Sequence, residues 1–313
     1  MPFRHRLAQT GPGDTRDAAI GAKARWSGGV RALAAGLFAA SLPVMSTPAT
    51  AGEVNVLYAG SLVNLMEHTV GPAFDKATGN HFQGYAGGSG GLANQIKGGL
   101  RQADVFISAS PKVNDSLMGA GNGDWESWYI TFGESPIVIG YNASSKFAAE
   151  LKTKPWYQVL QEPDIRIGLT NPKVDPKGAL TLTLMKQAET FYNSPGLSEE
   201  IIGVRPSVPE DLESALLQSG GLDVGFFYST ETADAKIPVL NLPPAITPKA
   251  VYTITILRHA PNPEGADKFV AYLLGSNGQI LLKEHGLTLR KLRVSGDSST
   301  VPQDIRVIVG DIM

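Results

Sequence analysis

Short apolar runs typical of strands alternate along the chain with apolar residues at helical spacing. The run 53–58 predicts a strand, and the small residues 59–61 connect it to a helical pattern over 62–70. The same order of strand, turn and helix follows at 82–100 and again at 103–118. This alternation predicts an α/β architecture.

The rest of the chain continues the pattern. Further strands are expected at 136–141, 165–169, 223–228 and 251–257. Further helices are expected at 145–162 (in pieces broken by Pro155), 179–192, 207–218, 263–274 and 277–285. Ser207 and Glu210 have the spacing of a capping box. Residues beyond about 291 are expected to form a surface tail and a final strand, on the same reading of the pattern.

The first 51 residues have the features of a signal peptide. Arg25 and Arg31 precede or interrupt an apolar run over 30–45, and Ala49-Thr50-Ala51 suits signal peptidase. Only about fourteen apolar residues follow Arg31 without interruption, which is short for a membrane span. We expect cleavage after Ala51, with a membrane anchor as the alternative, and the position of the start codon stays open.

Composition narrows the class of protein. The chain has 313 residues, of which 42% are hydrophobic and 18% charged, enough for one two-lobed unit or two modest domains. A net charge of -2 gives no basic field for a nucleic-acid partner. Cysteine is absent, which excludes thiolate catalysis, disulfides and cysteine-ligated zinc.

The sequence gives little sign of a catalytic site. The 5 histidines show no metal-ligand spacing, and the metalloprotease motif H-E-x-x-H does not occur. We therefore expect a binding protein with no cofactor rather than an enzyme. A hydrolase assembled from distant Ser, His and Asp residues remains the alternative from another class.

Two glycine-serine turns are candidates for anion binding. Gly60-Ser61 and Gly88-Ser89-Gly90 each follow a strand and precede a helix. Glycine lets the backbone approach a ligand, helix-start amides point outward, and serine adds a neutral donor. The alternative is that both are ordinary turns and helix caps.

Several segments together resemble a known family. The sequence resembles the molybdate/tungstate-binding proteins of ABC transporters, especially their tungstate-type branch, in order over about 53–290. The segments that carry the resemblance are Leu57–Leu62, Gly88–Gly90, Ala103–Val105, Ile165–Gly168 with Asn171–Gly178, Gln218–Tyr228, and Val251–Ile256 with Tyr272–Gly275.

The resemblance implies a type II periplasmic-binding-protein fold, in which two α/β lobes close over the ligand. Lobe 1 is then expected to comprise 52–140 and 245–313, and lobe 2 to comprise 141–244. The implied function is the capture of molybdate or tungstate in the periplasm for a membrane permease, by a protein that is a monomer. Sulfate or phosphate is the alternative ligand within the same fold.

The resemblance also assigns binding residues. Ser61 and Ser89 are expected to donate hydroxyl and amide hydrogen bonds, with Gly60 and Gly90 beside them. The implied further donors are the backbone amides of Lys177 and Leu212 and the hydroxyl of Tyr228. The alternatives are a core leucine, a solvated lysine and a packed aromatic ring.

Two carboxylates decide the expected coordination. The tungstate-type branch can complete six-coordination of the metal with an Asp and a Glu. Asp175 matches the Asp, whereas Pro209 occupies the Glu position and Glu210 lies one residue away. A four-coordinate anion is therefore an equal expectation, with Asp175 capping the helix that follows it. The sequence does not rank molybdate against tungstate.

Overall fold

A curled sheet organises the computed structural model, which describes residues 52–203 and 205–310. The strand order is β2-β1-β3-β8-β4-β6-β5, and β7 and β9 both pair with β4. The strands are β1 (Glu53–Ala59), β2 (His81–Gly87), β3 (Val105–Ser108), β4 (Trp128–Tyr141), β5 (Ile167–Gly168), β6 (Val224–Tyr228), β7 (Val239–Leu240), β8 (Lys249–Ile256) and β9 (Thr288–Gly296). The expected signal peptide, 1–51, lies outside the described residues.

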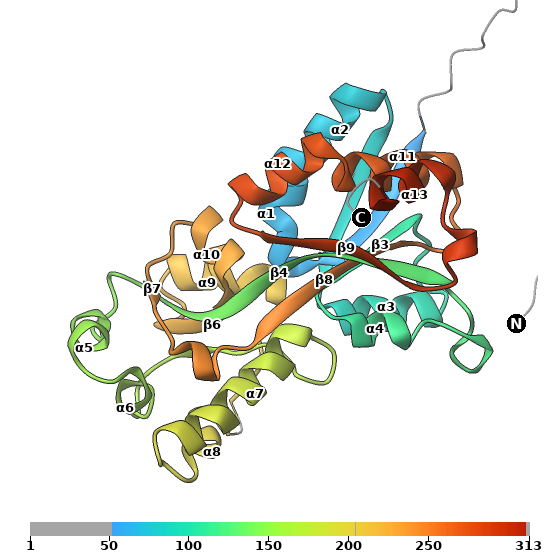
Figure 1. Ribbon diagram of the computed structural model, residues 1–313. Coiled ribbons are helices and arrows are strands. Elements are labelled where there is room, and N and C mark those ends of the chain that lie inside the picture. Colours follow the sequence, from blue (N-terminus) through green and yellow to red (C-terminus); the bar gives the residue numbers. More distant parts are fainter. Residues whose placement is uncertain (1–51, 204, 311–313) are drawn as a thin grey trace, which may run out of the picture. The chain divides into compact units, whose positions relative to one another are not determined.

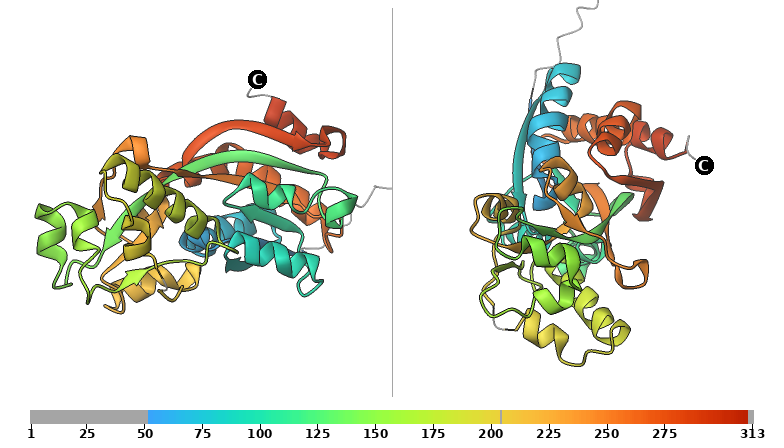
Figure 2. Two further views of the ribbon diagram at one scale, coloured as in Figure 1. Left: turned by 90° about the horizontal axis from the view of Figure 1, so that it is seen from below. Right: turned by 90° about the vertical axis from the view of Figure 1, so that its left-hand side faces the viewer.

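The long strand β4 connects the two α/β lobes (Figure 2). Its first part, Trp128–Pro136, pairs with β8 and β9, beside the parallel strands β1, β2 and β3 of lobe 1. Its last part, Ile137–Tyr141, pairs with β6 of lobe 2. The strand β4 therefore changes its partners between Pro136 and Ile137, and the expected lobe boundaries stay predictions. The described residues, 52–203 and 205–310, all belong to one compact unit.

Helices cover the sheet in both lobes (Figure 1). Lobe 1 carries η1 (Gly60–Leu62), α1 (Val63–Leu65), the π-helical turn η2 (Met66–Val70), α2 (Gly71–Thr78), α3 (Ser89–Lys97), α4 (Pro111–Asp115), η3 (Ala120–Asn122), α11 (Pro263–Leu274), α12 (Ser276–Glu284), η6 (Ser298–Thr300) and α13 (Gln303–Gly310). Lobe 2 carries α5 (Ala148–Thr153), α6 (Trp156–Val159), α7 (Pro176–Phe191), α8 (Leu197–Ile201), η4 (Glu210–Leu212), α9 (Glu213–Gln218), α10 (Ser229–Asp234) and η5 (Pro244–Ile246). Within the described residues, none of these helices is long and apolar enough to cross a membrane.

Most of the predicted elements are confirmed, but two strands and two helices differ from the expectation in ways described next. The strand β4 begins at Trp128, eight residues before its expected start, and β5 has only two residues. Helix α10 was not predicted, because the polar run Ser229–Asp234 has no apolar periodicity. Helix α13 replaces part of the expected tail and buries Ile305.

The predicted capping box at the start of the helix near 210 is wrong. Pro209 is the N-cap residue of η4 and makes no side-chain capping bond. The carboxylate of Glu210 instead accepts a hydrogen bond from Gly60 N, across the chain in lobe 1. A long-range partner has thus replaced the local one.

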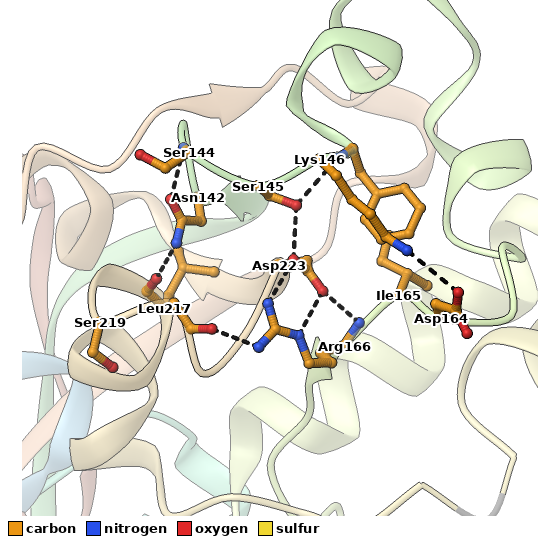
Figure 3. Close-up of polar contacts among 12 residues, drawn as sticks. Asn142, Ser144, Ser145, Lys146, Asp164, Ile165, Arg166, Leu217, Ser219 and Asp223 are labelled. Carbon is orange, nitrogen blue, oxygen red and sulfur yellow. Dashed lines mark hydrogen bonds and ion pairs between the residues drawn. The ribbon is translucent and has the colours of Figure 1, made fainter.

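An ion-pair network in lobe 2 fixes the strand that leads to the candidate site (Figure 3). Asp223, just before β6, accepts hydrogen bonds from Arg166 N, Nε and Nη2 at 2.8–2.9 Å and from Ser145 Oγ at 2.7 Å. Burial disfavours the charged carboxylate, but the bonds from Arg166 and Ser145 prevail and lower the pKa of Asp223 to about 2. The network therefore stays ionised at neutral pH and anchors the start of β6.

Candidate functional site

The first glycine-serine turn lies against lobe 2. Gly60 N donates to Glu210 Oε2 at 2.9 Å, and both groups are buried. A Cβ atom on Gly60 would lie 3.0 Å from that carboxylate oxygen, so glycine permits this close approach. The Ser61 hydroxyl is 3.0 Å from the Tyr252 hydroxyl on β8. This turn is therefore part of the interface between the lobes.

The second turn contacts a different segment of lobe 2. Gly91 N donates to the carbonyl of Val174 at 2.9 Å. A Cβ atom on Gly90 would lie 2.7 Å from the same carbonyl, which excludes a side chain there unless the backbone moves. Ser89 is fully buried, and its Oγ accepts a hydrogen bond from Ala109 N at 3.1 Å. Both predicted turns therefore face lobe 2 across the same interface.

Asp175 caps helix α7. This role is one of the two expected for it, the other being a ligand of the metal atom. Its Oδ1 accepts a hydrogen bond from Lys177 N at 2.8 Å. Burial raises the pKa of Asp175 above its usual range, although Lys177 opposes that rise. The Lys177 amide, expected as a ligand donor, is occupied by this cap in the structure.

The side chain of Lys177 is buried, so its interpretation as a solvated surface charge is wrong. The ammonium lies 2.9 Å from Glu231 Oε1, 2.8 Å from Glu213 Oε2 and 4.0 Å from Glu210 Oε1. Burial disfavours the ammonium, but the carboxylates of Glu213 and Glu231 hold the pKa of Lys177 well above its usual value. Lys177 thus joins α7, α9 and α10 beneath the interface.

The carboxyl groups around Lys177 outnumber it. Asp175, Glu210, Glu213 and Glu231 are all buried within reach of this one ammonium group. Burial raises the pKa of Glu210 well above its usual value and that of Glu213 to about 7. Burial likewise raises the pKa of Glu231. Burial therefore shifts these carboxyl groups toward their protonated forms, and the Lys177 ammonium opposes that shift.

Tyr228 offers an unused hydroxyl at the same place. The residue is fully buried, and its hydroxyl has no hydrogen-bond partner within 52–203 and 205–310. Its ring packs edge-on against Tyr252, with ring centroids 6.0 Å apart. Because a buried hydroxyl without a partner is costly, this one is available to a ligand.

Leu212 lies at the edge of the interface rather than in the core. Its side chain is 49% exposed, and its amide donates to the carbonyl of Pro209 at 3.2 Å. The alternative of a core leucine is therefore wrong. The turn η4 already uses the Leu212 amide. Its expected role as a donor to the ligand stays a prediction.

A cavity of about 190 Å³ lies between the lobes at these residues. Its lining comes from both lobes and includes Gly60, Ser61, Asn64, Glu210, Ser214 and Glu231. A larger hollow of about 680 Å³ lies between β9 and α13, with none of the candidate residues in its wall. The smaller cavity therefore contains the first predicted turn, Gly60 and Ser61, and Glu210, whereas Ser89, Asp175 and Tyr228 are not part of its lining.

Sequence reasoning missed four contributors to this site: Tyr252 and the side chains of Lys177, Glu213 and Glu231. Tyr252 lies in a strand with no motif around it, and the glutamates look like ordinary helix-surface residues. No local pattern marks them, because their partners are far apart in the sequence. An acidic run, Glu210, Asp211 and Glu213, was the one available signal.

Comparison with known proteins places the chain in a family. The family model for "Bacterial extracellular solute-binding protein" matches residues 54–288. The chain belongs to this family.

Relatives of this solute-binding protein include several named for molybdenum or tungsten. A molybdate/tungstate-binding protein of Thermococcus kodakarensis is 25% identical over 281 residues, covering 73% of this chain and 77% of the relative. A putative ABC transporter molybdenum-binding protein of Haloferax volcanii is 27% identical over 233 residues, covering 74% and 73%. The resemblance predicted from the sequence is confirmed by these matches.

Solved structures confirm the fold of this solute-binding protein. The periplasmic molybdate-binding protein of Azotobacter vinelandii superimposes with a TM-score of 0.61 at 22% identity, covering 76% of this chain and 99% of that one. The sulfate-binding protein of Mycobacterium tuberculosis superimposes with a TM-score of 0.59 at 16% identity, covering 84% and 92%. The expected periplasmic-binding-protein fold with two lobes is thus confirmed.

Proposed function

We propose that this protein captures molybdate or tungstate between its lobes and delivers it to a membrane ABC permease. The observation that carries the proposal is the buried hydroxyl of Tyr228, which has no hydrogen-bond partner in the described part of the chain. The Tyr228 ring packs against Tyr252, which contacts Ser61. The names of the molybdate- and tungstate-binding relatives support the choice of ligand.

Three hydroxyl groups can donate hydrogen bonds to such an anion. Ser89 Oγ accepts from Ala109 N, which leaves its own proton to donate onward. Ser61 can accept from Tyr252 and donate to the ligand in the same way. Tyr228 supplies the third donor. Neutral donors fit an anion that carries no proton of its own.

The acidic groups set a condition on binding. At about 4 Å, each pair of like unit charges repels by about 4 kcal/mol at an effective dielectric of about 20, so a dianion doubles the penalty. Glu210 escapes this penalty when it is protonated, which its raised pKa favours, and it then donates an O–H to the anion. Asp175 has committed Oδ1 to the helix cap.

We therefore propose a four-coordinate anion held by hydrogen bonds. In this arrangement the Glu210 carboxyl moves from Gly60 N to the anion, and the Gly60 amide becomes a further donor. Six-coordination would require Asp175 and Glu210 to direct oxygen atoms to the metal atom of the anion. The cap that Asp175 already makes favours the first arrangement.

The remaining proposals follow from the family. As an extracellular solute-binding protein, the mature chain is proposed to begin near Gly52, after removal of the signal peptide, and to work in the periplasm as a monomer. Its partners are then the oxyanion and the permease. The proposed work is binding, with no catalytic step and no resident cofactor.

Isothermal titration of residues 52–313 tests the function. Molybdate and tungstate are expected to bind at one site per protein, and sulfate and phosphate to bind at least about tenfold more weakly. Phosphate is the informative competitor, because a carboxylate such as Asp175 can accept its proton. Tighter binding of sulfate or phosphate, or no binding of any of the four anions, contradicts the proposal.

A further inference from the structure

His285 bridges the two lobes from the end of α12. Its Nδ1 lies 2.6 Å from Asp234 Oδ1, and its Nε2 lies 3.1 Å from Thr69 Oγ1. Thr69 is on the π-helical turn η2 in lobe 1, whereas Asp234 ends α10 in lobe 2. The imidazole of His285 therefore connects Thr69 in its own lobe to helix α10 of the other lobe.

The backbone beside His285 also packs on α10. Gly286 has a φ of +80°, and a Cβ atom there would lie 3.5 Å from the Ala233 Cβ and 3.9 Å from Thr230 Cα. The side chains of His285 and Asp234 are 25% and 14% exposed, so water competes only partly for their hydrogen bond. The turn after α12 thus meets α10 along a continuous contact.

The helix α10 carries part of the oxyanion site. It begins directly after Tyr228, and its Glu231 accepts a hydrogen bond from Tyr228 N at 2.7 Å. Glu231 also pairs with Lys177 at 2.9 Å. A displacement of α10 would therefore move the donor hydroxyl and the Lys177 cluster together.

We propose that His285 is a positioning residue that latches α10 to lobe 1 when the lobes close, and so slows release of the bound anion. The slower release of the anion rests on the proposed function, whereas the contact of His285 with α10 does not. A neutral imidazole can make both bonds, because Nδ1–H donates to Asp234 while Nε2 accepts from Thr69.

The chain offers matched controls for this bridge. The variant His285→Asn keeps a donor near the position of Nδ1, whereas His285→Gln keeps one near Nε2, which faces Thr69. His81 and Asp75 form a similar pair at 3.0 Å, but α2 and β2 place both within lobe 1. His81→Ala therefore removes a His–Asp pair without touching the interface between the lobes.

The distance between two spin labels, one in each lobe, measures lobe closure. Because the chain has no cysteine of its own, labels attach only at introduced cysteines. Leu100→Cys in lobe 1 and Phe191→Cys in lobe 2 are suitable positions, with exposed fractions of 81% and 51%. Without ligand, His285→Ala is expected to reduce the closed population several-fold. His285→Asn should restore it, while His285→Gln should not and His81→Ala should leave it unchanged. Equal closed populations in the parent and His285→Ala overturn the latch.

Dissociation of tungstate tests the link to the ligand. In stopped-flow experiments, His285→Ala is expected to release tungstate about tenfold faster than the parent, with His285→Asn close to the parent. An unchanged release rate overturns the role in ligand retention. If the parent binds no tungstate, the proposed function fails, while the spin-label distances still decide whether the latch exists.

Discussion

Replacing Lys177 by methionine is expected to lower the free energy of unfolding by about 3–5 kcal/mol. The substitution removes the ammonium that Glu213 and Glu231 contact at 2.8 and 2.9 Å. Their carboxyl groups then stay buried without a counter-charge from the described residues. Urea denaturation of the ligand-free protein at pH 8 measures the loss, because more of the carboxyl groups are ionised there.

Two variants control this experiment. Adding Glu213→Gln and Glu231→Gln to Lys177→Met should recover most of the stability, because neutral amides need no counter-charge. Lys154→Met removes an exposed pair with Glu150 at 2.8 Å and should change the stability by less than about 0.5 kcal/mol. If Lys177→Met unfolds at the urea concentration of the parent, the buried cluster does not form.

Ser61→Ala and Ser89→Ala are each expected to weaken tungstate binding roughly ten- to a hundredfold. Each substitution removes a hydroxyl donor to a charged ligand in a desolvated site, worth about 1.5–3 kcal/mol. Titration calorimetry measures the change, with Ser144→Ala in an exposed loop of lobe 2 as the control. Affinities equal to that of the parent in both variants would place the pocket elsewhere.

The two serines should differ in their effect on the ligand-free protein. Ser89→Ala leaves the amide of Ala109 buried without its acceptor, so about 1 kcal/mol or more of stability should be lost. Ser61 has a hydroxyl partner, Tyr252, rather than a backbone amide. Thermal unfolding without ligand separates this structural loss from the loss of affinity.

Local patterns predicted the parts of the fold that local forces determine. The turns at Gly60 and Gly88 could be found because a strand, glycine and serine, and then a helical pattern follow one another in the sequence. The early start of β4 could not, because Trp128 is held in the sheet by its pairing with Gly296, far along the chain. Helix α10 depends on the same kind of remote contact.

In the candidate site, too, contacts between residues far apart in the sequence could not be predicted. Ser61 and Ser89 were predicted from their glycine-serine turns and Tyr228 from the family resemblance. The role of the Lys177 side chain was not predicted, because a lysine after Asp-Pro looks like a surface residue. Its partners come from two other helices, and only the folded chain brings them together. Likewise, Glu210 was expected to pair with Ser207 in a local capping box, but its side chain accepts a hydrogen bond from Gly60 N in the other lobe.

A crystal of the protein with tungstate, measured at a tungsten absorption edge, tests the central claim most directly. The account predicts one anomalous peak between the lobes, with the anion oxygens in hydrogen-bond contact with the hydroxyls of Ser61, Ser89 and Tyr228. It also predicts that Asp175 still caps α7. A peak elsewhere, such as the hollow between β9 and α13, would contradict the assignment of the site, and carboxylate oxygens bonded to tungsten would contradict four-coordinate binding.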